Sequence, residues 1–184
     1  MSCINENKAT KRFSQLLIRK AVIGDAPALG NVVVTTWRKA YKNIVPDEFL
    51  DNMSSEKRAQ RFIHDLTNPS DFPYHFYVAE KDGCVIGFLS IGDYDGVVGS
   101  CIGEIGAIYL LPDFWGCGFG KQMMIFAIEA LREAGYKEIR LWVFEENART
   151  RRFYEDAGFK YTGLKKEKNY IKSLPIVQYA LDIN

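Results

Sequence analysis

Residues 109–121 read YLLPDFWGCGFGK, a hydrophobic run that ends at a proline and leads into three alternating glycines. Apolar side chains recur at helical spacing after the last glycine, so the stretch predicts a strand, a tight turn and a helix. Glycine allows positive φ angles and the close approach of another group. Unpaired N–H groups at the start of a helix attract anions, and Lys121 adds a positive charge. The stretch predicts a phosphate-binding turn, with a tight connection that binds nothing as the alternative.

Two other phosphate-binding patterns fit these glycines poorly. A P-loop needs GxxxxGK[ST], a spacing that residues 116–121 lack. A dinucleotide-binding turn needs GxGxxG in the first strand-helix unit of the domain. Here the third glycine comes one residue early, and the turn lies late in the chain. Neither pattern therefore explains the turn.

A second motif follows at residues 145–159, which read EENARTRRFYEDAGF. The pattern predicts a helix over 147–157 that is stopped by Gly158. Asn147 and Tyr154 are seven residues apart, so they would share one face of this helix, two turns from each other. The simple structural roles would be a helix N-cap for Asn147 and core packing for Tyr154.

Together these stretches resemble the two signatures of the GNAT superfamily of N-acetyltransferases. The first signature is Q/R-x-x-G-x-G/A after a strand that ends hydrophobic-x-hydrophobic-x-Pro, and this chain departs from it at Trp115, which replaces Gln or Arg. That departure removes one side-chain contact to a pyrophosphate. The second signature is N-x-x-A/R-x-x-F-Y-x-x-x-G-F, which the chain matches at Asn147, Phe153, Tyr154, Gly158 and Phe159. The resemblance extends from Leu17 to Ile183.

The resemblance implies an α/β (α+β) fold with a mixed, mainly antiparallel sheet that is splayed in the middle and carries helices on both faces. It also implies acetyl-CoA as co-substrate, with its pantetheine arm in the gap between the splayed strands. The residues that would bind it are Ile108, Tyr109, Leu110, Trp115, Gly116, Cys117, Gly118, Phe119, Gly120, Lys121, Asn147 and Tyr154.

The resemblance assigns catalytic roles as well. Tyr154 would protonate the leaving thiolate, a role that suits a phenol with a pKa of about 10. Glu104 would take the amine proton through water, with a surface carboxylate as the alternative. The backbone N–H of Leu110 would polarise the thioester carbonyl. Trp37 and Tyr41 are expected in the acceptor pocket, although helical packing explains Trp37 equally well.

Three further expectations concern neighbouring residues. Unbroken strand alternation would place Glu104, Gly106, Ile108 and Leu110 on one face, unless a bulge intervenes. Cys117 has no histidine partner that the sequence suggests, so no acyl-cysteine step is expected. The basic run of Arg149, Arg151 and Arg152 is expected to be a solvated helix face, with contact to the 3′-phosphate of the cofactor as the alternative.

The remaining elements follow from periodicity and from turn residues. The last two predicted strands cover 159–164 and 176–183. Earlier strands are expected over 15–21, 75–81, 84–94, 102–111 and 138–145. Helices are expected over 25–41, from 47, from 54 or 55 to 66, and over 118–134. This order of hairpins followed by alternating strands and helices is typical of a mixed α/β domain.

The composition sets outer limits. The 184 residues fit a single domain over 15–184 after a flexible tail at 1–14. With 24 Lys and Arg against 23 Asp and Glu, the net charge is +1, which argues against a general nucleic-acid binder. The cysteines form no CxxC pair and the two histidines lack ligand spacing, so no metal is expected. No signal peptide or membrane span appears, and a cytoplasmic location is expected.

The sequence therefore predicts an enzyme that transfers acetyl from acetyl-CoA directly to a primary amine of a small-molecule or peptide acceptor. Two alternatives are a non-catalytic acyl-CoA sensor and a dinucleotide-dependent enzyme. The acceptor, the acyl-chain preference and the oligomeric state stay open, and a homodimer through the final strand is one option.

Overall fold

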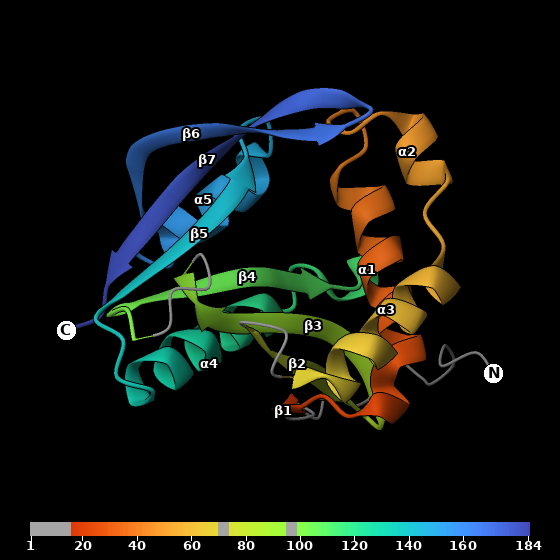
Figure 1. The fold of residues 1–184 in the computed structure, drawn as a ribbon, viewed down its shortest axis with the longest axis horizontal. Coiled ribbons are helices and arrows are strands. Elements are labelled where there is room, and N and C mark those ends of the chain that lie inside the picture. The colour runs from red at the N-terminus through yellow and green to blue at the C-terminus, as the bar shows by residue number, and fades with distance from the viewer. Residues whose placement is uncertain (1–15, 70–73, 95–98) are drawn as a thin grey trace.

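One seven-stranded sheet organises the chain in the computed structural model, which describes residues 16–69, 74–94 and 99–184 (Figure 1). The tail expected at 1–14 lies outside the described residues. The strands are β1 (Leu17–Lys20), β2 (Tyr74–Lys81), β3 (Cys84–Asp93), β4 (Ile102–Leu110), β5 (Glu138–Phe144), β6 (Lys160–Tyr170) and β7 (Lys172–Asp182). The helices are α1 (Ala26–Ala40), α2 (Asp47–Asp51), α3 (Ser55–Thr67), α4 (Phe119–Glu133) and α5 (Ala148–Asp156).

The strand order is β1-β2-β3-β4-β5-β7-β6. Only the β4–β5 pairing is parallel, and every other neighbouring pair is antiparallel. The predicted mixed, mainly antiparallel sheet is therefore confirmed. Within the described part of the chain, no helix combines the length and the apolar character needed to cross a bilayer.

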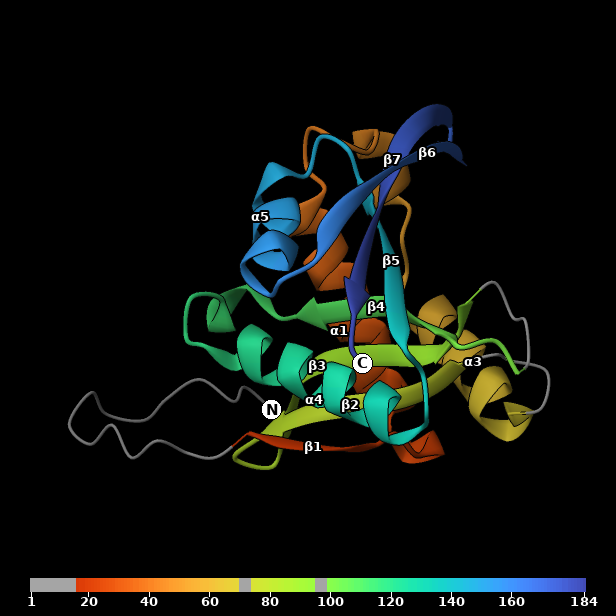
Figure 2. The same cartoon turned by 90° about the vertical axis from the view of Figure 1, so that its left-hand side faces the viewer.

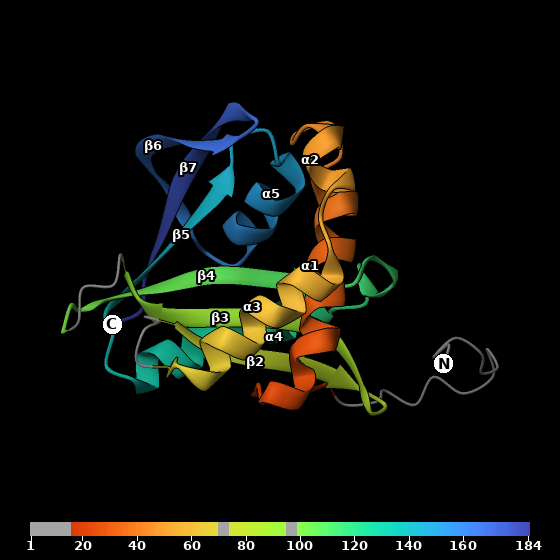
Figure 3. The same cartoon turned by 45° about the vertical axis from the view of Figure 1, so that its right-hand side comes forward.

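Helices cover both faces of the sheet, because the strand side chains alternate. Val78 and Phe88 pack with Leu29 and Phe62 of α1 and α3, whereas Ala79, Leu89 and Ile105 join Met123, Met124 and Leu131 of α4 on the other face. Figure 3 shows α1 and α3 on the near side of β3 and α4 behind it. Each large apolar side chain buried in this way contributes about 1.5–3 kcal/mol.

The sheet splits between β4 and β5. These strands pair only where Ile102–Glu104 faces Glu138–Arg140, and beyond that point β5 rises away from β4 (Figures 1 and 2). A bulge adds to the distortion, since Ile105 pairs with Ile91 and Ala107 with Ser90, which leaves Gly106 as the extra residue. The splayed centre that the resemblance implied is confirmed.

The last two strands are longer than predicted. β6 and β7 form a hairpin whose turn residue Ile171 has a φ of 63°. Strand β6 is exposed along almost its whole length and includes the charged run KKEK at 165–168. An exposed strand needs no apolar alternation, and so the sequence pattern ended the strand too early.

Candidate active site

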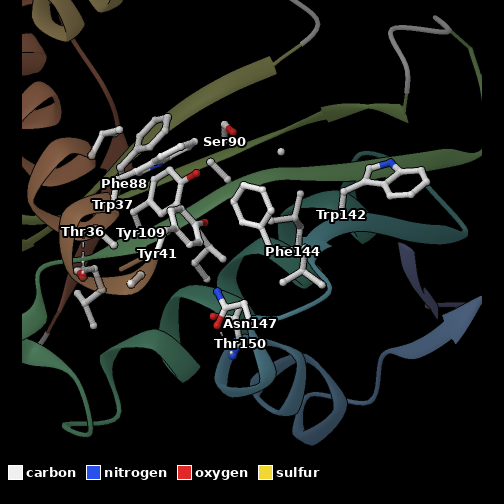
Figure 4. A pocket seen from close by; sticks show the side chains of 18 of the residues that line it. Thr36, Trp37, Tyr41, Phe88, Ser90, Tyr109, Trp142, Phe144, Asn147 and Thr150 are labelled. Atoms are coloured by element: carbon white, nitrogen blue, oxygen red, sulfur yellow. Dashed lines mark hydrogen bonds between the residues drawn. The ribbon is translucent and has the colours of Figure 1, made fainter. Parts of the chain in front are cut away.

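A cleft of about 1190 Å³ lies at the split between β4 and β5. Its walls come from α1, α3, β2 to β6, the glycine turn and α5. Figure 4 shows Trp37, Tyr41 and Tyr109 grouped next to α1, with Asn147 and Thr150 coming from the start of α5. The volume exceeds that of an ordinary single-ligand pocket, so the cleft has room for two reactants.

The glycine turn forms one end of the cleft. Gly116 and Gly118 have φ angles of 78° and 84°, a conformation that favours glycine. A Cβ at either position would meet nothing within 4 Å, so the space above the turn is open. Helix α4 begins directly after Gly118 without a side-chain cap. Its first N–H groups and Lys121 therefore suit an anion at this end of the cleft.

Trp115 is fixed between β4 and α5. Its Nε1 donates to the carbonyl oxygen of Leu110 at 2.7 Å, and the Arg149 guanidinium lies 4.1 Å from its ring centroid. Arg149 lines the cleft. Arg151 instead donates to the Tyr179 hydroxyl at 3.0 Å, and Arg152 is exposed and does not line the cleft. The basic run thus divides into three different environments.

Asn147 and Tyr154 both line the cleft from the start and the end of α5. Asn147 is buried and caps the helix, because its Oδ1 accepts from the backbone N–H of Thr150 at 3.2 Å. The Tyr154 ring is 6% exposed. Burial, together with the nearby Tyr109 phenol, raises the pKa of Tyr154 well above its ordinary value. The Tyr154 hydroxyl therefore stays protonated until very alkaline pH.

Glu104 is buried in the cleft and accepts a hydrogen bond from the Tyr74 hydroxyl at 2.7 Å. The alternative of a surface carboxylate is wrong, since only 7% of the residue is exposed. The bulge that was named as the exception to strand alternation is present at Gly106, and it reverses the faces. Glu104 shares the α1 side with Tyr109, whereas Ile108 and Leu110 pack in the core with α4.

The backbone of Leu110 points into the split. Leu111 donates its N–H to Ile86 on β3 at 2.9 Å, and successive strand N–H groups point in opposite directions. The N–H of Leu110 is therefore directed away from β3. Its carbonyl oxygen likewise accepts from the Thr36 hydroxyl at 3.1 Å rather than from a strand.

Aromatic side chains form the wall next to α1. Trp37 and Tyr41 have ring centroids 4.8 Å apart, and Tyr41 and Phe144 lie 4.9 Å apart. Tyr170 of β6 completes this group at 5.5 Å from Trp37. Trp37 and Tyr41 both line the cleft. Sequence reasoning missed Phe144 and Tyr170, because only the fold brings β5 and β6 against α1.

The predicted cofactor residues gather along one cleft with two exceptions. Cys117 and Phe119 belong to the turn, but they do not line the cleft. The Cys117 side chain is exposed, and the Phe119 ring lies 6.2 Å from Phe114. Their backbone groups still form part of the turn that opens α4.

Comparison with known proteins agrees with this geometry. Residues 35–159 match the model of the acetyltransferase (GNAT) family. The chain belongs to this family. As a member, it is an acetyl-CoA-dependent acyltransferase, and the match covers the glycine turn, β5 and α5.

Individual relatives are more distant. The chain is 27% identical to an uncharacterized N-acetyltransferase, YuaI, of Bacillus subtilis over 71% of this chain and 72% of that protein. It is 26% identical to a spermidine N(1)-acetyltransferase of Thermoplasma acidophilum over 78% and 87% of the two chains. The PaiA N-acetyltransferase of T. acidophilum, solved in complex with coenzyme A, superposes with a TM-score of 0.71 at 24% identity, covering 89% and 98% of the chains.

Proposed function

We propose that this chain transfers an acetyl group from acetyl-CoA directly to a primary amine of a small-molecule or peptide acceptor. The observation that carries the proposal is the continuity of the cleft. The open glycine turn, the buried phenol of Tyr154 and the buried carboxylate of Glu104 all line the same space between β4 and β5.

The residues at the turn fit the phosphate end of acetyl-CoA. The N–H groups that open α4 and the side chain of Lys121 offer hydrogen bonds and positive charge to a pyrophosphate. Arg149 adds a second cation from α5. Its guanidinium lies over the ring of Trp115, a residue that itself carries no charge. Asn147 would hold the pantetheine arm next to this turn, while its Oδ1 keeps its role as helix cap.

The reacting end of the thioester would lie where β4 leaves β5. The Leu110 N–H is directed into this gap and would donate to the thioester oxygen as negative charge develops there. The attacking nitrogen forms the new bond to the acetyl carbon as the carbon–sulfur bond breaks. Glu104 takes the proton from the amine through water, and Tyr154 gives its proton to the departing sulfur.

The burial of Tyr154 supports this last role. A phenol whose pKa is raised by burial stays protonated throughout the neutral range, so it is ready to donate to a thiolate. Among the described residues, no hydrogen bond from the Tyr154 hydroxyl is found, which leaves its proton available.

A panel of primary amines with acetyl-CoA tests the proposal, with release of free CoA thiol as the readout. The proposal predicts release that depends on both acetyl-CoA and an amine. A non-catalytic acyl-CoA sensor would be stabilised by acetyl-CoA against heat without releasing thiol. A dinucleotide-dependent enzyme would be stabilised by NAD and not by acetyl-CoA.

A further inference from the structure

The charges that line the cleft are uneven. Cations clearly outnumber carboxylates, although the whole chain is almost neutral. The lining cations are Lys39, Arg58, Lys121, Arg149, Lys166 and Lys168, and the lining carboxylates are Glu104 and Glu167. Lys121 and Arg149 belong to the phosphate end already described. The remaining cations, Lys39, Arg58, Lys166 and Lys168, are not explained by binding of phosphate at that end.

Three of these cations lie outside the phosphate end and line the cleft together with the aromatic wall. They are Arg58 of α3 and Lys166 and Lys168 of β6. None of the three is in an ion pair among the described residues, whereas the adjacent Lys165 binds Glu145 at 2.6 Å. The carboxylate between the two lysines, Glu167, accepts a hydrogen bond from the Ser173 hydroxyl at 2.7 Å. The acceptor side therefore carries unpaired positive charge.

Aromatic contacts locate this charge. Lys168 Nζ lies 5.9 Å from the Tyr170 ring centroid, and Lys166 Nζ lies 3.9 Å from that of Trp142. Burial raises the pKa of the Tyr170 phenol, and the charge of Arg58 lowers it. Burial also raises the pKa of Tyr109, and the charge of Lys168 lowers it. Lys168 of β6 thus lies beside Tyr170 of the aromatic wall, and Arg58 lines the same cleft from α3.

We propose that the amine acceptor also carries an anionic group on a compact apolar body. This inference rests on the proposed function, because it names the acceptor class for the same site. The amine would lie near Glu104, and the apolar body would lie against Tyr41, Phe144 and Tyr170. The anion, a carboxylate or a phosphonate, would bind Arg58 and Lys168 by charge-assisted hydrogen bonds.

The same charges disfavour a polyamine. A spermidine molecule has no anion to offer, so its second and third ammonium groups would meet the unpaired cations of α3 and β6. The acceptor of this chain is therefore of a different class from the one named for the T. acidophilum spermidine acetyltransferase.

Paired acceptors test the proposal directly. Phenylalanine, leucine and tryptophan form one arm, the amines left when their carboxylates are removed form the second, and the matching aminophosphonates form the third. Spermidine is the polyamine control. The proposal predicts a higher kcat/KM, by about 10-fold or more, for anionic members of either type than for their uncharged partners. A preference for spermidine or the decarboxylated amines, or turnover of no anionic member, would overturn it.

Substitutions locate the effect. Arg58→Gln and Lys168→Gln should lower the ratio of kcat/KM for an anionic acceptor over its decarboxylated partner by about 10- to 100-fold. Lys165→Gln removes a cation from the same strand outside the cleft and should leave that ratio unchanged. If all three variants keep the wild-type ratio, the assignment of the anion site is wrong. Failure of the proposed function itself would look different, since no amine of any charge would then release thiol.

Discussion

The Arg149 guanidinium lies 4.1 Å from the Trp115 ring centroid, beside the glycine turn. Trp115 occupies the position where the first family signature has Gln or Arg, so this position supplies no polar side chain to the turn. Arg149 of α5 brings a cation to the same turn instead. We predict that Arg149→Gln raises the KM for acetyl-CoA by about 10-fold, because one charge-assisted contact to phosphate is lost. Initial-rate kinetics at saturating acceptor measures this.

The matched control is Arg152→Gln. Arg152 is exposed on the same helix and does not line the cleft, so its substitution should leave this KM unchanged. Equal effects of the two substitutions would mean that Arg149 acts only through the overall charge of α5.

Tyr154→Phe should lower kcat by about 100- to 1,000-fold while the KM for acetyl-CoA stays within a few-fold of wild type. The substitution removes the proton donor but keeps the buried ring that packs near Phe159 and Tyr179. Tyr161→Phe serves as the control, because Tyr161 is 49% exposed on β6. A kcat for Tyr154→Phe equal to that of wild type would remove the general acid from the mechanism.

The pH dependence of the wild-type enzyme follows from the same phenol. An acid must be protonated to act, and burial raises the pKa of Tyr154 above its ordinary value of about 10. The contribution of Tyr154 to kcat as a proton donor is therefore fully present at low and neutral pH. It is lost only well above pH 10, where the phenol loses its proton. A pH profile of kcat with a fall centred below about pH 9 would contradict this, provided that the fold is intact there.

Glu104→Gln should lower kcat/KM for the acceptor by about 100-fold at neutral pH, because the amine proton then has no base to accept it. The kcat/KM of the variant should approach that of the wild type as the pH rises, because more of the amine is then already neutral. Tyr74→Phe removes the 2.7 Å hydrogen bond to Glu104 and should cause a smaller loss of kcat/KM, because the carboxylate itself remains. If the kcat/KM of Glu104→Gln is the same fraction of the wild-type kcat/KM at all pH values, Glu104 has a structural role.

Gly30→Ala tests the packing that holds the acceptor wall. A Cβ at Gly30 would lie 2.3 Å from the Ser55 carbonyl oxygen and 3.0 Å from the Ala59 nitrogen, so α1 and α3 would have to separate. We expect the free energy of unfolding to fall by about 1–3 kcal/mol, measured by urea denaturation. Gly24→Ala is the control, since its Cβ would meet nothing within 4 Å. Equal stability of the two variants would contradict the close approach of α1 and α3.

The sequence predicted the elements that hold local signals. The glycine turn, the helix after it and the Asn147 cap are encoded within short stretches, and the structure has them where the patterns indicated. The mainly antiparallel sheet and its central split came from family resemblance rather than from periodicity, and the strand order was not predicted. Those features depend on pairings between distant segments, which a single sequence does not show.

The misses have physical causes. Strand alternation alone could not predict the face on which Glu104 lies, because the bulge at Gly106 is a property of the β3–β4 register and of close contact with Tyr74 and Ser90. A Cβ at Gly106 would lie 2.8 Å from Tyr74 Cε1, so the glycine was a usable signal that strand alternation alone ignored. Tyr170 could not be found as a cleft residue, because its strand was expected to end at residue 164, whereas β6 continues to Tyr170.

The central proposal is that this cleft transfers acetyl from acetyl-CoA to an amine. The most direct measurement follows free CoA thiol and the acetylated amine together, by thiol titration and mass spectrometry, for the wild-type chain and for Tyr154→Phe. We predict equal amounts of thiol and acetylated amine from the wild-type chain, and little of either from the variant. Acetyl-CoA that binds tightly but gives no acetylated amine with any acceptor of the panel would contradict the claim.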